Sequence, residues 1–132
     1  MILDTSAIVA IALKEPDYDM LLKKLVEAHH VGVGLPTLTE AAIVLSARLK
    51  QDARGTLSRF LVEGSIATVP FGDAHFSVAV DAWLRYGKVR HPASLNFGVC
   101  LSYATAQLAE ARPTRRRSPP GGASYLGLIL HE

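Results

Sequence analysis

Short apolar segments alternate along the chain with longer stretches of helical periodicity, and this alternation restricts the folds that the chain can adopt. Three apolar segments have the length of strands: residues 1–3, 31–34 and 66–70. The periodicity predicts helices over residues 7–13, from Pro16 onward, and over residues 36–50, 52–63, 73–86 and 96–108. Such alternation predicts an α/β fold in which helices cover both faces of a parallel sheet.

Length and composition indicate a globular protein. The chain has 132 residues, of which 49% are hydrophobic and 20% are charged. A single cysteine excludes a disulfide framework and a cysteine-rich zinc site, so a reducing compartment is expected. No apolar run approaches the roughly 20 residues that span a bilayer, and residues 1–6 carry no basic leader. We therefore expect a cytoplasmic protein that does not enter the membrane.

Residues 111–132 differ in composition from the rest of the chain. They contain four arginines and one acid, whereas residues 1–110 carry ten basic and eleven acidic side chains. Three prolines and two glycines between positions 112 and 124 interrupt any periodicity. We predict one domain over residues 1–110 and an atypical basic segment over residues 111–132, with a last edge strand at 125–130.

Asp4 is the first candidate site residue, because it follows three apolar residues that read as a buried strand. In a parallel sheet, ligands bind outside the C-terminal ends of the strands. A buried carboxylate is costly unless a positive group meets it. Either a divalent cation or the first N–H groups of the next helix satisfy that need. The neighbouring Thr5 and Ser6 suit helix capping and ligand contacts equally well.

Glu40 is the second candidate, and it also has two interpretations. It stands three residues after Thr37, which is the spacing of a capping box. The residues that follow, 41–45, are wholly apolar, so Glu40 is also the one acid at the mouth of a buried helix.

The other polar candidates are weaker. Lys88, Arg90 and His91 form a basic cluster, and such clusters are more often solvated loops than ligand sites. Asn96 and Asp73 are predicted to cap the helices that follow them. No histidine pair has the spacing of a zinc site. Cys100 lies in an apolar helical stripe and is interpreted as an inert core thiol.

Four segments in order carry a resemblance to a known family. They are residues 1–10 (MILDTSAIVA), 15–17 (EPD), 38–45 (LTEAAIVL) and 86–98 (YGKVRHPASLNFG). Over about residues 1–110 the chain resembles the PIN-domain ribonucleases, specifically the VapC-type toxins of bacterial toxin–antitoxin pairs. The resemblance implies a three-layer α/β/α fold with a central, mainly parallel sheet. It also implies a Mg²⁺-dependent or Mn²⁺-dependent endoribonuclease that forms a homodimer and is neutralised by a VapB-type antitoxin.

The resemblance also implies roles for individual residues. Asp4 and Glu40 would hold the ion as the catalytic pair, with Thr5, Ser6 and Asn96 in support. Lys88, Arg90 and His91 would bind the RNA backbone.

Two departures from the family pattern concern activity. Val99 stands where the family has an aspartate of the metal site, and residues 111–131 contain no acid where the family has another. Valine cannot coordinate an ion, so we expect a weakened nuclease. The alternative is a catalytically impaired scaffold that still dimerises and binds an antitoxin. An Arg-, Pro- and Gly-rich tail is what a GC-rich gene yields in a wrong frame, which suggests a frameshift after about Glu110.

Overall fold

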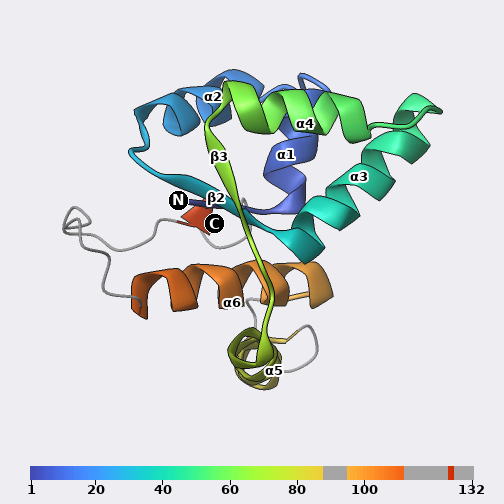
Figure 1. The fold of residues 1–132 in the computed structure, drawn as a ribbon. Helices are drawn as coiled ribbons and strands as arrows, with labels where there is room; N and C mark the ends of the chain where they lie inside the picture. The colour runs from blue at the N-terminus through green and yellow to red at the C-terminus, as the bar shows by residue number, and fades with distance from the viewer. Residues whose placement is uncertain (88–94, 112–124, 127–132) are drawn as a thin grey trace.

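The computed structural model describes residues 1–87, 95–111 and 125–126, and it has the predicted α/β architecture (Figure 1). The strands are β1 (Ile2–Leu3), β2 (Val31–Gly34), β3 (Ile66–Val69) and β4 (Tyr125–Leu126). The helices are α1 (Thr5–Ala12), α2 (Tyr18–Glu27), α3 (Leu35–Leu49), α4 (Arg54–Glu63), α5 (Asp73–Tyr86) and α6 (Phe97–Ala111). Most elements therefore lie where the periodicity predicts them.

The sheet has the strand order β3-β2-β1-β4, and every pair of neighbouring strands is parallel. All four residues of β2 are buried, as expected for a strand of a parallel sheet with both faces covered. The last strand was expected over 125–130; Tyr125 and Leu126 pair with β1, and residues 127–130 lie outside the described part. The predicted division of the chain after residue 110 stays a prediction.

The helices form the two outer layers of a three-layer α/β/α fold. Helices α1 to α4 lie on one side of the sheet in Figure 1, and α6 lies on the other with α5 packed beneath it. The larger core lies under α1 to α4 and contains Leu3, Ile8 and Leu45, all fully buried. A second cluster joins α5 to α6 through Ala79, Ala82, Leu95, Val99, Cys100 and Ala104.

Two predicted helix starts are wrong. Pro16 precedes α2, whose N-cap is Asp17, so the proline belongs to the connection and not to the first turn. Asp73 is the first residue of α5, and Gly72 is the N-cap. The Gly72 N–H donates to Nδ1 of His75 at 3.1 Å, so a side chain of the first turn closes this end of the helix.

Helix α3, which the apolar run 41–45 predicts to be buried, leaves some apolar side chains exposed. Ile43 is 65% exposed, whereas Ala41 and Leu45 of the same helix are fully buried. Within the described ranges, none of the helices combines the length and the apolar character that a membrane span requires.

A substitution at Gly34 tests how closely strand β2 packs against helix α6. A Cβ at this position would lie 2.8 Å from Oγ1 of Thr105, so we expect Gly34→Ala to destabilise the protein by about 1–3 kcal/mol. Gly55→Ala is the matched control, because a Cβ on this glycine of α4 would have no neighbour within 4 Å. Urea unfolding measures both. An equal effect of the two substitutions would contradict the close approach, and Thr105→Ala should reduce the cost at Gly34.

Candidate functional site

Asp4 lies immediately after β1 and is buried, with 3% of its surface exposed. It is the N-cap of α1: its Oδ1 accepts hydrogen bonds from the Ala7 N–H and from the Ser6 hydroxyl, both at 2.9 Å. Its other oxygen, Oδ2, is buried and has no hydrogen-bond donor among the described residues. Helix capping therefore explains one carboxylate oxygen of Asp4 and leaves the other without a partner.

The surroundings of Asp4 disfavour its negative charge. Burial raises the pKa of the Asp4 carboxyl, and the nearby charge of Glu40 raises it further. The hydrogen bonds from Ala7 and Ser6 lower this pKa and offset part of the rise. The ionised carboxylate is therefore less stable in the fold than in the unfolded chain, and a bound cation would remove that cost.

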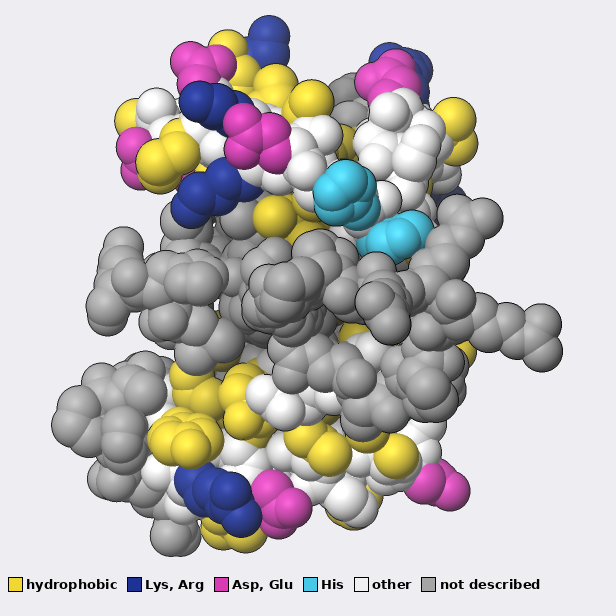
Figure 2. All heavy atoms as spheres, turned by 90° about the vertical axis from the view of Figure 1, so that its left-hand side faces the viewer, with side chains coloured by type: hydrophobic (Ala, Val, Ile, Leu, Met, Phe, Trp, Pro, Cys, Tyr) yellow, Lys and Arg dark blue, Asp and Glu magenta, His cyan; other side chains and the backbone are white. Residues whose placement is uncertain are grey.

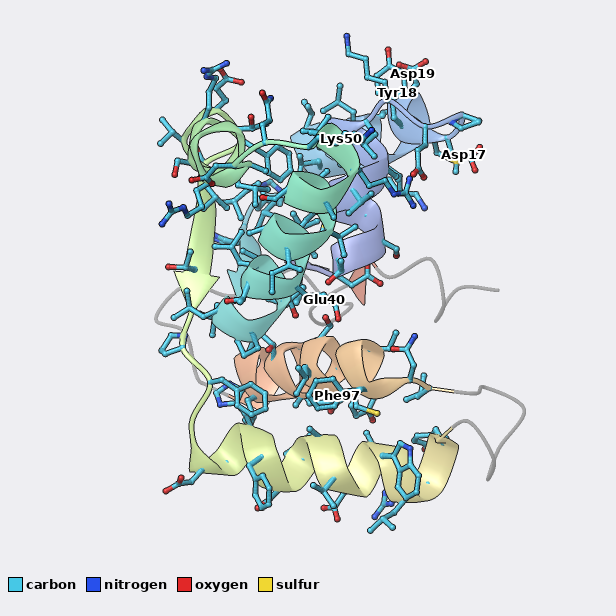
Figure 3. All side chains as sticks on the ribbon, turned by 90° about the vertical axis from the view of Figure 1, so that its right-hand side faces the viewer. Asp17, Tyr18, Asp19, Glu40, Lys50 and Phe97 are labelled. Atoms are coloured by element: carbon cyan, nitrogen blue, oxygen red, sulfur yellow. The ribbon has the colours of Figure 1, made fainter. Side chains whose placement is uncertain are left out.

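Glu40 extends from the second turn of α3 toward α6 (Figure 3). A Cβ added to Gly98 would lie 3.0 Å from Oε2 and 3.1 Å from Oε1 of Glu40, so the carboxylate lies against the first turn of α6. The capping-box interpretation of Glu40 is wrong. Thr37 lies inside α3 and the N-cap is Gly34, which has no side chain to close the box.

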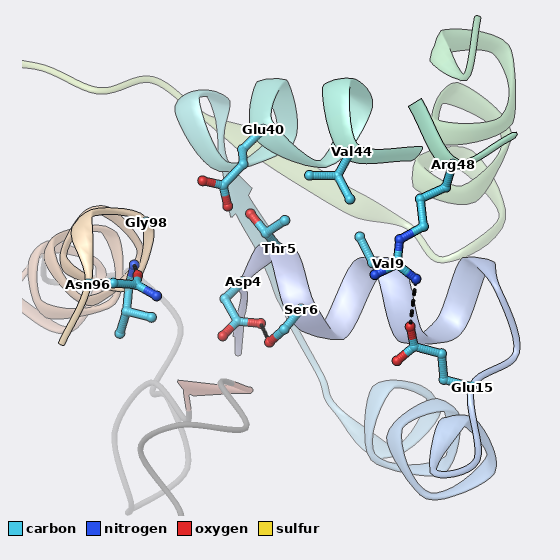
Figure 4. A pocket seen from close by; sticks show the side chains of 11 residues that line it. Asp4, Thr5, Ser6, Val9, Glu15, Glu40, Val44, Arg48, Asn96 and Gly98 are labelled. Atoms are coloured by element: carbon cyan, nitrogen blue, oxygen red, sulfur yellow. Dashed lines mark hydrogen bonds and ion pairs between the residues drawn. The ribbon is translucent and has the colours of Figure 1, made fainter. Parts of the chain in front are cut away.

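Asp4 and Glu40 line the same pocket, which has a volume of about 320 Å³ (Figure 4). The pocket lies between α1, α3 and the start of α6. Its lining residues are Asp4, Thr5, Ser6, Val9, Glu15, Glu40, Val44, Arg48, Asn96, Gly98 and Val99. The fold thus brings together two acids that are 36 positions apart in the sequence.

Hydroxyl groups connect the three helices that surround the pocket. The Thr5 hydroxyl of α1 donates to the Thr37 carbonyl of α3 at 3.5 Å. The Thr37 hydroxyl in turn lies 3.1 Å from that of Ser102 on α6, within hydrogen-bond distance. These contacts fix the starts of α1 and α3 against α6, and so they fix the positions from which Asp4 and Glu40 extend.

Asn96 caps α6 as predicted, since its Oδ1 accepts the Val99 N–H at 2.9 Å. The Val99 side chain is almost fully buried and packs in the cluster between α5 and α6, at the wall of the pocket.

Among residues 1–87 and the described part of α6, no three acidic, histidine or cysteine side chains are placed to share a metal ion. Lys88, Arg90 and His91 lie outside the described residues.

Arg48, Glu15 and Gly98 also belong to the pocket, and the sequence patterns assigned them no role. Nη1 of Arg48 and Oε1 of Glu15 form an ion pair at 3.6 Å. One signal for Arg48 was present in the sequence: it follows Glu40 by eight residues, which places both on one face of a helix. Gly98 has no such signal, because its role depends on the approach of α3.

Comparisons with known proteins show the family to which the chain belongs. The model of the PIN domain family matches residues 1–112. The chain is 43% identical over 109 residues to Ribonuclease VapC36 of Mycobacterium tuberculosis, covering 82% of this chain and 78% of that protein. It is 36% identical to Ribonuclease VapC of Mycolicibacterium smegmatis, covering 83% of this chain and 84% of the relative. Ribonuclease VapC30 of Mycobacterium tuberculosis is 34% identical, with 83% of each chain covered.

We expect Asp4→Asn to stabilise the metal-free protein by about 1 kcal/mol, because asparagine keeps the Oδ1 acceptor and removes the buried charge. Thermal unfolding in EDTA at neutral pH measures the change. Asp81→Asn, the same substitution at an exposed position of α5, should leave the melting temperature unchanged. A lower melting temperature for Asp4→Asn would show that the charge of Asp4 is compensated in the fold.

Proposed function

The chain belongs to the PIN-domain family, in which its relatives are VapC ribonucleases, and we propose that it is a metal-dependent endoribonuclease acting as the toxin of a type II toxin–antitoxin pair. One observation carries the proposal: Asp4, whose buried Oδ2 has no hydrogen-bond donor among the described residues, lines the same pocket as Glu40. Two carboxylates that line one pocket and have no ion-pair partner among the described residues are suited to a hard divalent cation.

The described residues fit Mg²⁺, with Mn²⁺ as the alternative. Mg²⁺ keeps several waters and is commonly held by one or two carboxylates together with substrate phosphate. Asp4 and Glu40 are the residues that would hold it. When bound, the ion supplies an activated water and stabilises charge on the leaving oxygen of a phosphodiester.

The remaining residues of the pocket orient these two acids. Ser6 and the Ala7 N–H hold Oδ1 of Asp4, which leaves Oδ2 as the free oxygen. Thr5 ties the start of α1 to α3, and Asn96 fixes the first turn of α6, against which Glu40 rests. The N-terminus of a helix carries a partial positive charge, which favours an anionic substrate at this point. Lys88, Arg90 and His91 are proposed to bind the RNA backbone.

Val99 weakens the proposed site. An aspartate in the first turn of α6 would add a third oxygen donor beside Glu40, whereas valine supplies an apolar wall. At an effective dielectric constant of about 20, unit charges 4 Å apart interact by about 4 kcal/mol before desolvation is counted. The loss of one carboxylate is therefore expected to lower the affinity for the ion.

A second candidate function is an antitoxin-binding scaffold that dimerises without cutting RNA. It is favoured by the two-acid site and by an apolar stripe on α5, where Phe76, Val80, Trp83 and Leu84 are exposed at helical spacing. In Figure 2 hydrophobic side chains lie over α5 and α6 with a few charged side chains among them, and both kinds also lie over the opposite end of that face. A homodimer and a VapB-type antitoxin are the partners that we propose.

We expect Mg²⁺ at millimolar concentration to raise the melting temperature, because a ligand that binds only the folded state stabilises it by mass action. Asp4→Asn and Glu40→Gln should each abolish the rise, together with Mg²⁺-dependent cleavage of RNA. EDTA serves as the control for both measurements. No shift and no cleavage in the unaltered chain would favour the scaffold.

The Val99→Asp substitution tests the consequence of the missing acid. We expect Val99→Asp to increase the Mg²⁺-dependent melting shift and to raise the rate of RNA cleavage by at least about tenfold. Val99→Asn is the control for lost packing, since it introduces a polar group of similar size without charge. If the unaltered chain cleaves RNA as fast as Val99→Asp does, valine is not a defect of the site.

A further inference from the structure

The pocket continues beyond the two acids. From Asp4 and Glu40 it passes Val9 and Val44 and ends at the ion pair of Arg48 and Glu15 (Figure 4). The end at Arg48 is not explained by a site for one divalent ion. A ligand that contacts both Arg48 and the two acids would have to be longer than a single phosphate group.

Helix α3 sets the spacing along the pocket. Glu40, Val44 and Arg48 follow one another at intervals of four residues, so they line one face of the helix. With a rise of about 1.5 Å per residue, the backbone of Arg48 lies about 12 Å along the helix axis from that of Glu40. The guanidinium of Arg48 pairs with Glu15 at the far end of the pocket, so it is placed to contact a phosphate farther along a strand than one held at the acids.

Charge also distinguishes the two ends. Asp4, Glu40 and Glu15 are acidic, and of the described residues that line the pocket Arg48 is the one with a positive charge. The nearest distance to Glu15, 3.6 Å, exceeds hydrogen-bond length, and both side chains are about half exposed. An exposed pair of this kind contributes little stability, and a guanidinium has five N–H donors. Arg48 can therefore exchange Glu15 for a phosphate at small cost.

We propose that Arg48 binds a backbone phosphate of the RNA substrate, at a nucleotide next to the cleaved position on the strand. This proposal rests on the ribonuclease function proposed above. Arg48 binds that phosphate with the paired N–H groups that suit phosphate oxygens. The apolar walls at Val9 and Val44 accommodate the sugar or base between the two phosphates.

Binding of RNA in a cleavage-deficient background tests the role of Arg48. Short single-stranded RNA is titrated into Asp4→Asn and into the double variant Asp4→Asn/Arg48→Ala, with fluorescence anisotropy as the readout. We expect the second substitution to weaken binding about tenfold and to reduce the slope of log affinity against log salt by about one. Arg48→Lys should recover part of the loss, since it keeps the charge without the paired donors.

Further variants test whether a loss of RNA binding comes from the lost phosphate contact, from the lower net charge of the protein or from a loss of folding. Arg85→Ala removes an exposed arginine of α5, outside the pocket, and should leave RNA binding unchanged. Glu15→Gln should leave binding unchanged or strengthen it, because it removes the competing acid. Arg48 is exposed, so Arg48→Ala should keep the melting temperature of the parent.

The outcomes distinguish a failure of the role proposed for Arg48 from a failure of the proposed ribonuclease function. If neither the unaltered chain nor Asp4→Asn binds RNA, the ribonuclease function fails. If RNA binds equally well with and without Arg48, the function stands and the role of Arg48 is overturned. If Arg48→Ala spares RNA binding but weakens binding of a poly-glutamate peptide, Arg48 serves a protein partner, and the proposal is likewise overturned.

Discussion

A buried carboxylate oxygen to which no described residue donates a hydrogen bond is the feature on which the proposed site depends. Oδ1 of Asp4 closes the start of α1, and this cap holds Oδ2 in a buried position where no donor from the described residues reaches it. Burying a charge without compensation opposes folding. The rest of the protein supplies the stability that tolerates it, since Leu3 and Ile8 on either side of Asp4 are fully buried in the larger core.

The three-layer arrangement explains why a second acid lies near Asp4. Helix α3 leaves the sheet directly after β2, which is the neighbour of β1, so the first turns of α1 and α3 lie side by side. Helix α6 covers the opposite face, and its first turn meets Glu40 at Gly98. The hydroxyl contacts of Thr5 and Thr37 hold these helix starts together. The site is thus a meeting point of three helix N-terminal regions.

In the proposed function, the two ends of the pocket have different roles. Near the sheet, Glu40 and Asp4 accumulate negative charge that suits a cation. Two turns farther along α3, Arg48 offers positive charge that suits an anion. A nucleic-acid strand has phosphates at regular intervals, so it matches both ends when the acids are neutralised. Val99, in the pocket wall beside Glu40, is expected to affect the proposed ion site and not the contact proposed for Arg48.

The sequence by itself determined the order of strands and helices, the place of Asp4 after the first strand, the cap at Asn96 and the family resemblance, which the family model confirms. These features follow from local periodicity, capping preferences and short motifs. Local spacing misled at Thr37, whose capping-box pattern falls inside α3. The roles of Asp4 and Glu40 as ion ligands stay predictions. Only the tertiary structure decided that Asp4, Glu40 and Arg48 share one pocket, because that depends on how distant helices pack across a sheet.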